Sequence, residues 1–325
     1  MSTELLTESS RLQDRTVRSI HRLFPIEDTE SWDFYNKQKR SYWVVEEVDM
    51  SSDGADFASL RKEEQRVLQY VLAFFASSDS VVSEKLMESL YKDAPSQQSR
   101  MFYAMQMAIE AVHTETYNML ISVCVPVESR DALFNAVVSL PTVRAKREWF
   151  DRTSTGSWPQ RLVVQSIVEG VMFSSSFAFI FWIKQRFQGK FPGLTLSNVL
   201  ISRDEALHRD FSIMLYRRSV GMGEDRLDTL VREAIDLEKA FVCEAFDGNG
   251  LLGLSHQSIC QYIEFVADHL LSSMGHNKMY NTSNPYPWME NISLQNKENF
   301  FECKVGNYAL MADSRPKNLE FDADF

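Results

Sequence analysis

The 325-residue sequence has few cysteines, and no two of them are close together in the sequence. The four cysteines, Cys124, Cys243, Cys260 and Cys303, are scattered along the chain without a Cys-x-x-Cys pair. This pattern argues against a disulfide framework and against a metal site built from thiolates. We therefore expect the protein to work in a reducing compartment.

A long hydrophobic run is also missing. The longest apolar stretch, Phe173 to Ile183, contains three serines and is too short to span a bilayer. The segment from Met1 to Ser10 has no apolar core of the kind that signal peptides carry. These absences predict a soluble, cytoplasmic protein that does not bind a membrane.

Positive charge is in the minority. The sequence has 34 Lys and Arg against 45 Asp and Glu, so its formal net charge is −11. Because an acidic surface repels phosphate backbones, we expect no nucleic-acid partner.

Strand patterns are scarce, and apolar residues instead recur at positions i, i+3, i+4 and i+7. This spacing predicts helices over residues 57–92, 97–124, 128–139, 142–152, 159–188, 195–219, 224–246 and 254–275. Residues 24–56, which include Pro25, Trp32 and Trp43, are predicted to form an extended arm. The expected class is all-α, with an N-terminal segment over 1–23, a helical domain over 24–310 and a flexible tail over 311–325.

Two Glu-x-x-His pairs have the spacing of metal ligands. In Glu110–His113, and again in Glu205–His208, the separation of three residues places both side chains on one helix face. Carboxylate oxygen and imidazole nitrogen suit ions such as iron and manganese. For one such pair in isolation, an exposed polar helix face is the alternative.

Two further carboxylates, Asp79 and Glu169, stand in strongly apolar helical stretches where burial is expected. Taken singly, each could cap a helix or make an internal hydrogen bond. Together with the two pairs, they provide one carboxylate from each of two helices and Glu-x-x-His from each of two others. That set is typical of a di-metal carboxylate four-helix bundle, so we predict a ferritin-like fold.

A tyrosine lies close to this predicted site. Tyr117 follows His113 by four residues, about one helical turn, so both side chains can point inward. Phe173, Phe177 and Ile201 could form a hydrophobic pocket that separates Tyr117 from water. A core tyrosine without a special role is the alternative interpretation.

From about residue 24 onward, nearly the whole chain resembles a known family. The matching motifs are, in order, Tyr42-Trp43-Val-Val-Glu-Glu-Val-Asp49, Phe-Phe-Ala-Ser-Ser-Asp79, Glu110-x-x-His113-x-x-x-Tyr117, Glu169-Gly-Val-Met-Phe-Ser-Ser-Ser-Phe177, Ser202-Arg-Asp204-Glu205-Ala-Leu-His208, Tyr262-Ile-Glu-Phe-Val-Ala-Asp268 and Phe321-Asp-Ala-Asp-Phe325. In this order they resemble the small subunit of class I ribonucleotide reductase, of the eukaryotic or viral type. Two residues beside the expected site depart from the family, Ser175 where relatives often have Gly and Met172 where they often have Phe.

The resemblance implies a set of roles. The six metal ligands of the family match Asp79, Glu110, His113, Glu169, Glu205 and His208. Tyr117 matches the tyrosine that becomes a stable radical when the reduced metals react with dioxygen. Asp204, Trp43 and Tyr308 match residues that transfer the radical to a large subunit, which reduces ribonucleoside diphosphates to deoxyribonucleotides. A homodimer is implied as well. The ligand types do not decide between iron and manganese, but Tyr117 favours two irons.

The last residues of the chain have an interpretation of their own. Phe321 and Phe325 are separated by the acidic residues Asp322 and Asp324. We expect this tail to dock in a groove of the large subunit and to become ordered on binding. An inert acidic tail is the alternative.

Three other functions compete with this prediction. A di-iron oxidase or desaturase acting directly on an organic substrate would need an open pocket beside the metals, and Tyr117 and the tail count against it. An iron-storage protein of the ferritin type is usually much shorter and needs no arm that carries Trp43. In an interaction protein that had lost the chemistry, ligands should be missing, whereas all six and Tyr117 are present.

Overall fold

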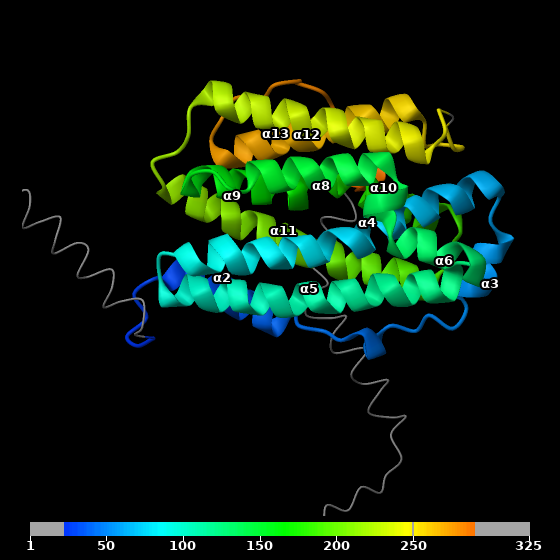
Figure 1. Ribbon diagram of the computed structural model, residues 1–325, viewed down its shortest axis with the longest axis horizontal. Helices are drawn as coiled ribbons and strands as arrows, with labels where there is room; N and C mark the ends of the chain where they lie inside the picture. The colour runs from blue at the N-terminus through cyan, green and yellow to red at the C-terminus, as the bar shows by residue number, and fades with distance from the viewer. Residues whose placement is uncertain (1–22, 249, 290–325) are drawn as a thin grey trace, which may run out of the picture. The chain divides into compact units, whose positions relative to one another are not determined.

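The computed structural model describes residues 23–248 and 250–289, with side chains for all of these except residues 79, 80, 81, 83, 86 and 137. The chain divides into two compact units between Pro285 and Tyr286, and all helices named below belong to the first unit (Figure 1). They are α2 (Thr29–Arg40), α3 (Asp53–Ser59), α4 (Lys62–Lys85), α5 (Gln97–Cys124), α6 (Val127–Phe134), α7 (Ala136–Ser139), α8 (Pro141–Thr153), α9 (Trp158–Ile167), α10 (Ser174–Arg186), α11 (Pro192–Arg218), α12 (Glu224–Ala245) and α13 (His256–Met274), with a 3₁₀ turn η1 (Val45–Glu47) and two π-helical segments, η2 (Leu86–Tyr91) and η3 (Val168–Met172). The prediction of an all-α fold is confirmed.

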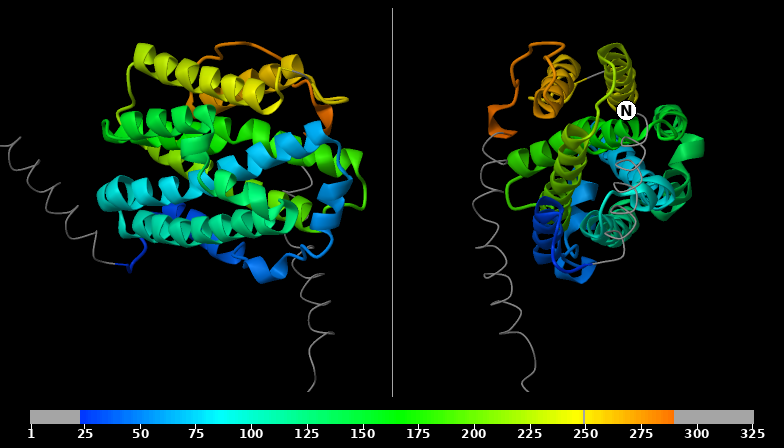
Figure 2. Two further views of the ribbon diagram at one scale, coloured as in Figure 1. Left: turned by 45° about the vertical axis from the view of Figure 1, so that its right-hand side comes forward. Right: turned by 90° about the vertical axis from the view of Figure 1, so that its left-hand side faces the viewer.

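Four helical segments, α4, α5, η3 and α11, lie at the centre of the first unit. α4 packs against α5, α11 packs against α9, and η3 contacts α11, α12 and α13. Figures 1 and 2 show α12 and α13 side by side on one side of this bundle and α2 on the opposite side. α2 packs against α5 and α11, so it covers the two helices that carry the Glu-x-x-His pairs.

The run Trp158–Arg186, which comprises α9, η3 and α10, is the most apolar part of the bundle. It is long and apolar enough to cross a membrane, but 94% of its most apolar window is buried inside the protein. A helix covered by other helices on every side is expected to be hydrophobic all round. The run is therefore the core helix of the bundle.

The prediction of an extended arm over residues 24–56 is wrong for its first half, which forms α2. Asp28 caps this helix, because its carboxylate accepts a hydrogen bond of 3.1 Å from the Ser31 backbone N–H. Glu30 stands in the first turn and basic residues stand in the last, which favours the helix dipole. These cap signals are visible in the sequence. They favour a helix here, and they should have outweighed the nearby proline and tryptophans, which suggested an extended segment.

Three of the predicted helices are interrupted in the structure. The stretch 57–92 is divided at Leu60 between α3 and α4 and ends as η2, and the stretch 128–139 is divided at Asn135 between α6 and α7. The stretch 159–188 widens into η3. A π-helical turn inserts one residue into an α-helix, and such turns are frequent at functional sites. η3 contains Glu169, one of the predicted ligands.

Candidate metal centre

Three carboxylates and two imidazoles from α5, η3 and α11 meet in the interior of the bundle. The potential ligand atoms of Glu110, Glu169, Glu205 and His208 all lie within 4.8 Å of one another. His113 joins them, because its Nδ1 lies 3.3 Å from Glu110 Oε2 and 3.1 Å from Glu205 Oε1. All five side chains are buried. The structure thus brings together five of the six residues that the sequence predicts as ligands.

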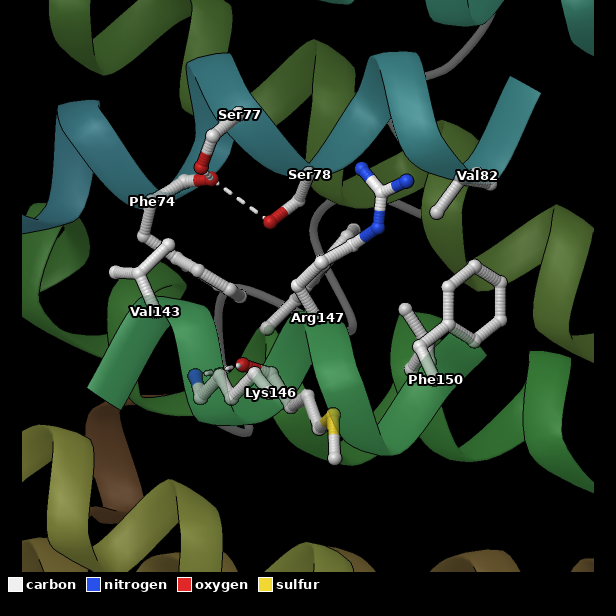
Figure 3. Close-up of a pocket in the computed structure, with 11 residues that line it drawn as sticks. Phe74, Ser77, Ser78, Val82, Val143, Lys146, Arg147 and Phe150 are labelled. Carbon is white, nitrogen blue, oxygen red and sulfur yellow. Dashed lines mark hydrogen bonds between the residues drawn. The ribbon is translucent and has the colours of Figure 1, made fainter. Parts of the chain in front are cut away.

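The sixth predicted ligand, Asp79, lies on α4, and its side chain is outside the described part of the structure. The residues that precede Asp79 and Glu169 in the sequence, Ser78 and Val168, line one cavity of about 30 Å³. Figure 3 shows Ser78 on the wall that α4 forms. Residues of α4 and η3 that adjoin the two predicted ligands therefore face the same cavity.

Six atoms in this cluster make no hydrogen bond of good geometry with the residues that the structure describes. They are Glu110 Oε2, Glu169 Oε2, both carboxylate oxygens of Glu205, His113 Nδ1 and His208 Nδ1. The two Nδ1 atoms among them still lie within 3.3 Å of carboxylate oxygens. A buried polar atom without a partner costs about 1–3 kcal/mol, and more when it is charged. A cation among these atoms would remove that cost, and oxygen and nitrogen donors of this kind hold iron or manganese. The residues therefore fit a metal site.

The outer nitrogens of the two imidazoles are both occupied. His113 Nε2 lies 3.3 Å from Asp204 Oδ2, and His208 Nε2 lies 2.9 Å from the amide nitrogen of Gln38. Asp204 can accept the Nε2 proton of His113, which orients that ring and leaves Nδ1 for a metal. Gln38 would do the same for His208 with its amide reversed, so that Oε1, which has no hydrogen-bond partner among the described residues, faces the ring. Gln38 is a functional residue that the sequence analysis missed, because it lies on α2, within the segment predicted to be extended.

Asp204 connects His113 to Trp43. Trp43 Nε1 donates a hydrogen bond of 2.8 Å to Asp204 Oδ2, and the Trp43 and His113 rings are stacked with centroids 6.1 Å apart. Burial favours the neutral acid, but Arg203, His113 and Trp43 together lower the pKa of Asp204. Asp204 is therefore a carboxylate that links the cluster to a buried indole. Tyr308, predicted to continue this line, lies outside the described residues.

Two glutamines hold one oxygen of Glu169. Gln106 Nε2 and Gln165 Nε2 donate hydrogen bonds of 2.7 and 2.5 Å to Glu169 Oε1. Each glutamine lies four residues before a predicted ligand, Glu110 or Glu169, and so on the same helix face. That spacing could have identified both residues from the sequence.

Tyr117 lies in an aromatic environment and is 1% exposed. Its ring stacks on Phe75, with centroids 4.5 Å apart and an interplanar angle of 8°. Phe173 and Phe177 contact Phe75 at centroid distances of 5.4 and 4.9 Å, and Ile201 is also buried. The sequence analysis missed Phe75, although it lies one helical turn before a predicted ligand.

Without a metal, the cluster holds protons. Burial opposes a charged imidazole, but the surrounding carboxylates raise the pKa of His113 well above its ordinary value and raise that of His208 to about 10. Burial raises the pKa of Glu169 well above the usual range, and the nearby negative charges add to this effect. Each of these protons occupies a group that a metal ion would need.

We expect metal uptake to weaken as the pH falls. The raised pKa values of His113 and His208 keep both imidazoles protonated near neutral pH, so each must release a proton when a metal binds. Lowering the pH from about 8 to about 6 should lower the apparent Mn(II) affinity by about tenfold or more. Calorimetric titrations in buffers of different ionisation enthalpy measure the proton release directly. An affinity that does not change with pH would contradict this arrangement of the site.

A helical bundle that buries Glu and His side chains from facing helices defines the class of ferritin-like di-metal carboxylate proteins. The family model described as "Ribonucleotide reductase, small chain" matches residues 20–285. The protein belongs to this family.

Relatives of known function agree with this family. The protein is 42% identical over 318 residues to the ribonucleoside-diphosphate reductase small subunit of Dictyostelium discoideum, a match that covers 93% of each sequence. It is 40% identical over 328 residues to ribonucleoside-diphosphate reductase subunit M2 of Rattus norvegicus, with coverage of 98% of this sequence and 83% of the relative. The predicted function is confirmed: the protein is a small subunit of ribonucleoside-diphosphate reductase, an oxidoreductase that is active only with its large subunit.

Solved structures support the same fold. A ribonucleotide reductase homodimer from Saccharomyces cerevisiae matches with a TM-score of 0.75 and 28% identity, over 94% of this chain and 99% of that one. Dimanganese(II)-NrdF from Streptococcus sanguinis has the same fold, with a TM-score of 0.74 and 18% identity, over 83% of this chain and 98% of that one. Family membership and the buried cluster together identify a di-metal site. Membership of the small-subunit family, and not the cluster, argues against the iron-storage and desaturase alternatives.

Proposed function

We propose that this chain generates and stores a tyrosyl radical on Tyr117, beside two iron ions. The ions would be held by Asp79, Glu110, His113, Glu169, Glu205 and His208. One observation carries the proposal: buried carboxylate and imidazole atoms without hydrogen bonds of good geometry converge one helical turn from Tyr117. When bound, the metal pair supplies the oxidising power, drawn from dioxygen, that is needed to oxidise a phenol. Iron is favoured over manganese because a buried tyrosine stands beside the site.

The surroundings of Tyr117 would protect a radical once it has formed. The phenol is 1% exposed, and Phe75 covers one face of its ring. Phe173 and Phe177 pack behind Phe75, so the neighbouring side chains are hydrocarbon rings that do not readily give up an electron or a hydrogen atom. Exclusion of water keeps small reductants from reaching the phenol.

The line from His113 through Asp204 to Trp43 would carry the radical equivalent out of the site. Asp204 Oδ2 lies close to both His113 Nε2 and Trp43 Nε1, and the lowered pKa keeps this carboxylate ionised. An ionised carboxylate can accept the indole proton when Trp43 loses an electron. Tyr308 would continue the path toward the large subunit.

The chain would work in the cytoplasm as a homodimer. The homodimeric structure of the yeast relative supports the assembly. Cys124, Cys243 and Cys260, the cysteines within the described residues, are free thiols, which suits a reducing compartment.

The large subunit would bind the tail residues Phe321, Asp322, Asp324 and Phe325, which lie outside the described residues. We expect deletion of residues 319–325 to leave the radical intact and to weaken large-subunit binding by about a hundredfold or more, since buried aromatic anchors typically contribute about 2 kcal/mol or more each. The binding constant measures the effect. A double variant, Asp322→Asn with Asp324→Asn, separates the contribution of charge from that of the rings. Unchanged affinity after the deletion would rule out the docking role.

The direct test of the proposed function is an electron paramagnetic resonance (EPR) spectrum. Metal-free full-length chain is loaded with Fe(II), exposed to oxygen and measured. Two irons per chain and a tyrosyl signal support the proposal. Two bound irons without a radical would overturn the role of Tyr117, and a chain that binds no metal would instead be an interaction protein that has kept the fold.

A further inference from the structure

A buried ion pair lies outside the metal cluster, where η3 ends and α10 begins. Lys146 of α8 and Glu238 of α12 form this pair, and their side chains are 4% and 0% exposed. Removing two charges from water often costs more than their attraction returns. Stability alone is therefore a poor explanation for this ion pair.

Both partners also bind the backbone at the junction of η3 and α10. Lys146 Nζ donates a hydrogen bond of 3.1 Å to the carbonyl of Met172, the last residue of η3. Glu238 Oε1 accepts a hydrogen bond of 3.2 Å from the backbone N–H of Ser175, in the first turn of α10, and a second one from the Ser175 hydroxyl. One charge thus satisfies a carbonyl at the end of the π-helical segment, and the other caps the helix that follows.

The ammonium group of Lys146 is also held between aromatic rings. It lies 3.7 Å from the ring centroid of Phe74 and 4.0 Å from that of Phe241. Figure 3 shows Lys146 on α8, along the wall of the cavity opposite Ser78, with the hydrogen bond from its amine drawn as a dashed line. The ion pair, the hydrogen bond and the two aromatic rings together fix the position of the Lys146 ammonium group.

The π-helical form of η3 connects this ion pair to the metal cluster. Glu169 lies in η3, three residues before Met172. A π-helical turn holds one extra residue, and it is rare within α-helices except at functional sites. If η3 relaxed to an α-helix, the residues on its two sides would rotate relative to one another by about 100°, the turn of one residue. Glu169 would then no longer face the cluster.

We propose that Lys146 and Glu238 are positioning residues for Glu169. The ion pair fixes the junction between η3 and α10, which keeps η3 in its π-helical form and the Glu169 carboxylate at the metal position. The Ser175 hydroxyl strengthens the junction through its hydrogen bond to Glu238. This inference rests on the proposed role of Glu169 as a metal ligand.

The test uses a double variant of the full chain, Lys146→Met with Glu238→Leu. Replacing both charges by apolar side chains of similar size often leaves a protein as stable as before, whereas removing one charge does not. Binding of Mn(II) alone is followed through the EPR signal of the free ion, and thermal unfolding is measured in parallel. We expect one of the two Mn(II) sites to weaken by about 10- to 100-fold at a temperature well below the melting transition. The melting temperature should itself fall by several degrees, because the Met172 carbonyl and the Ser175 N–H lose their partners.

A matched control removes a second ion pair. Lys239 of α12 and Glu264 of α13 lie 2.6 Å apart and are partly exposed. The double variant Lys239→Met with Glu264→Leu should bind Mn(II) as the unaltered chain does. Normal Mn(II) binding by the Lys146 and Glu238 variant would overturn the proposal, and so would a loss of affinity that only follows a lowered melting temperature.

Two further variants complete the test. Glu169→Ala separates this inference from the proposed function: if it weakens Mn(II) binding and the Lys146 and Glu238 variant does not, only the positioning role is wrong. If Glu169→Ala binds Mn(II) normally, the ligand assignment and the positioning role are both wrong. Should the double variant fail to fold, Glu238→Gln replaces it, since it removes the negative charge of the ion pair and keeps an oxygen that can accept from Ser175. A smaller loss of affinity in Glu238→Gln supports the proposal, and unchanged affinity overturns it.

Discussion

Replacing Tyr117 by Phe should abolish the tyrosyl signal and reduce turnover to background while two metal ions stay bound. A phenyl ring has no O–H to lose and cannot be oxidised under these conditions, so no radical can be stored at this position. The substitution removes one oxygen from a side chain that is 1% exposed and leaves its stacking on Phe75 possible. We expect the free energy of unfolding to change by no more than about 1–2 kcal/mol.

Three measurements check this prediction: the EPR spectrum, the iron content and turnover with the large subunit. The matched control is Tyr103→Phe, because Tyr103 is a second buried tyrosine on the same helix. The control variant should keep the tyrosyl signal. A normal signal in the Tyr117→Phe chain would assign the radical to another residue.

Replacing Trp43 by Phe should separate radical storage from radical transfer. The variant loses the hydrogen bond of 2.8 Å from Trp43 Nε1 to Asp204 and the readily oxidised indole, but a phenyl ring can still pack on His113. Asp204 keeps its hydrogen bonds from Arg203, so its charge remains compensated. We expect the tyrosyl signal to form in this variant and turnover with the large subunit to fall to background.

Trp149→Phe is the control for the loss of a buried indole. Trp149 is 2% exposed, and its Nε1 donates a hydrogen bond of 2.9 Å to Glu233. Neither residue makes a hydrogen bond to His113, Asp204 or Trp43 among those found in the described residues. This variant should lose about 1–2 kcal/mol of stability and keep its turnover. Substantial turnover in the Trp43→Phe chain would show that the radical leaves by another route.

Local spacing predicts the metal ligands because an α-helix repeats every 3.6 residues. Glu110 and His113 share a face for this reason alone, as do Glu205 and His208, and the structure places all four in one cluster. Burial follows from the same pattern, since the residues around these pairs are apolar. The all-α fold and the family could likewise be predicted, because they depend on many such local patterns in a fixed order.

Local spacing does not show which distant side chains meet. Gln38 reaches His208 from 170 positions away, and its helix was predicted to be extended. Phe75, on which Tyr117 stacks, belongs to α4, and Gln106, which donates a hydrogen bond to Glu169, belongs to α5. Contacts of this kind depend on how helices pack, and packing is decided by the whole set of side chains that must fill the interior.

The sequence by itself determined the all-α class, most of the helices, the ligand types and their spacing, because each of these follows from neighbours within one or two turns. The tertiary structure decided the π-helical form of η3. An inserted residue is favourable only where other helices satisfy the backbone groups that it disturbs. Lys146 and Glu238, from α8 and α12, do so at Met172 and Ser175. The position of the Glu169 carboxylate is thus determined by residues far from it in the chain.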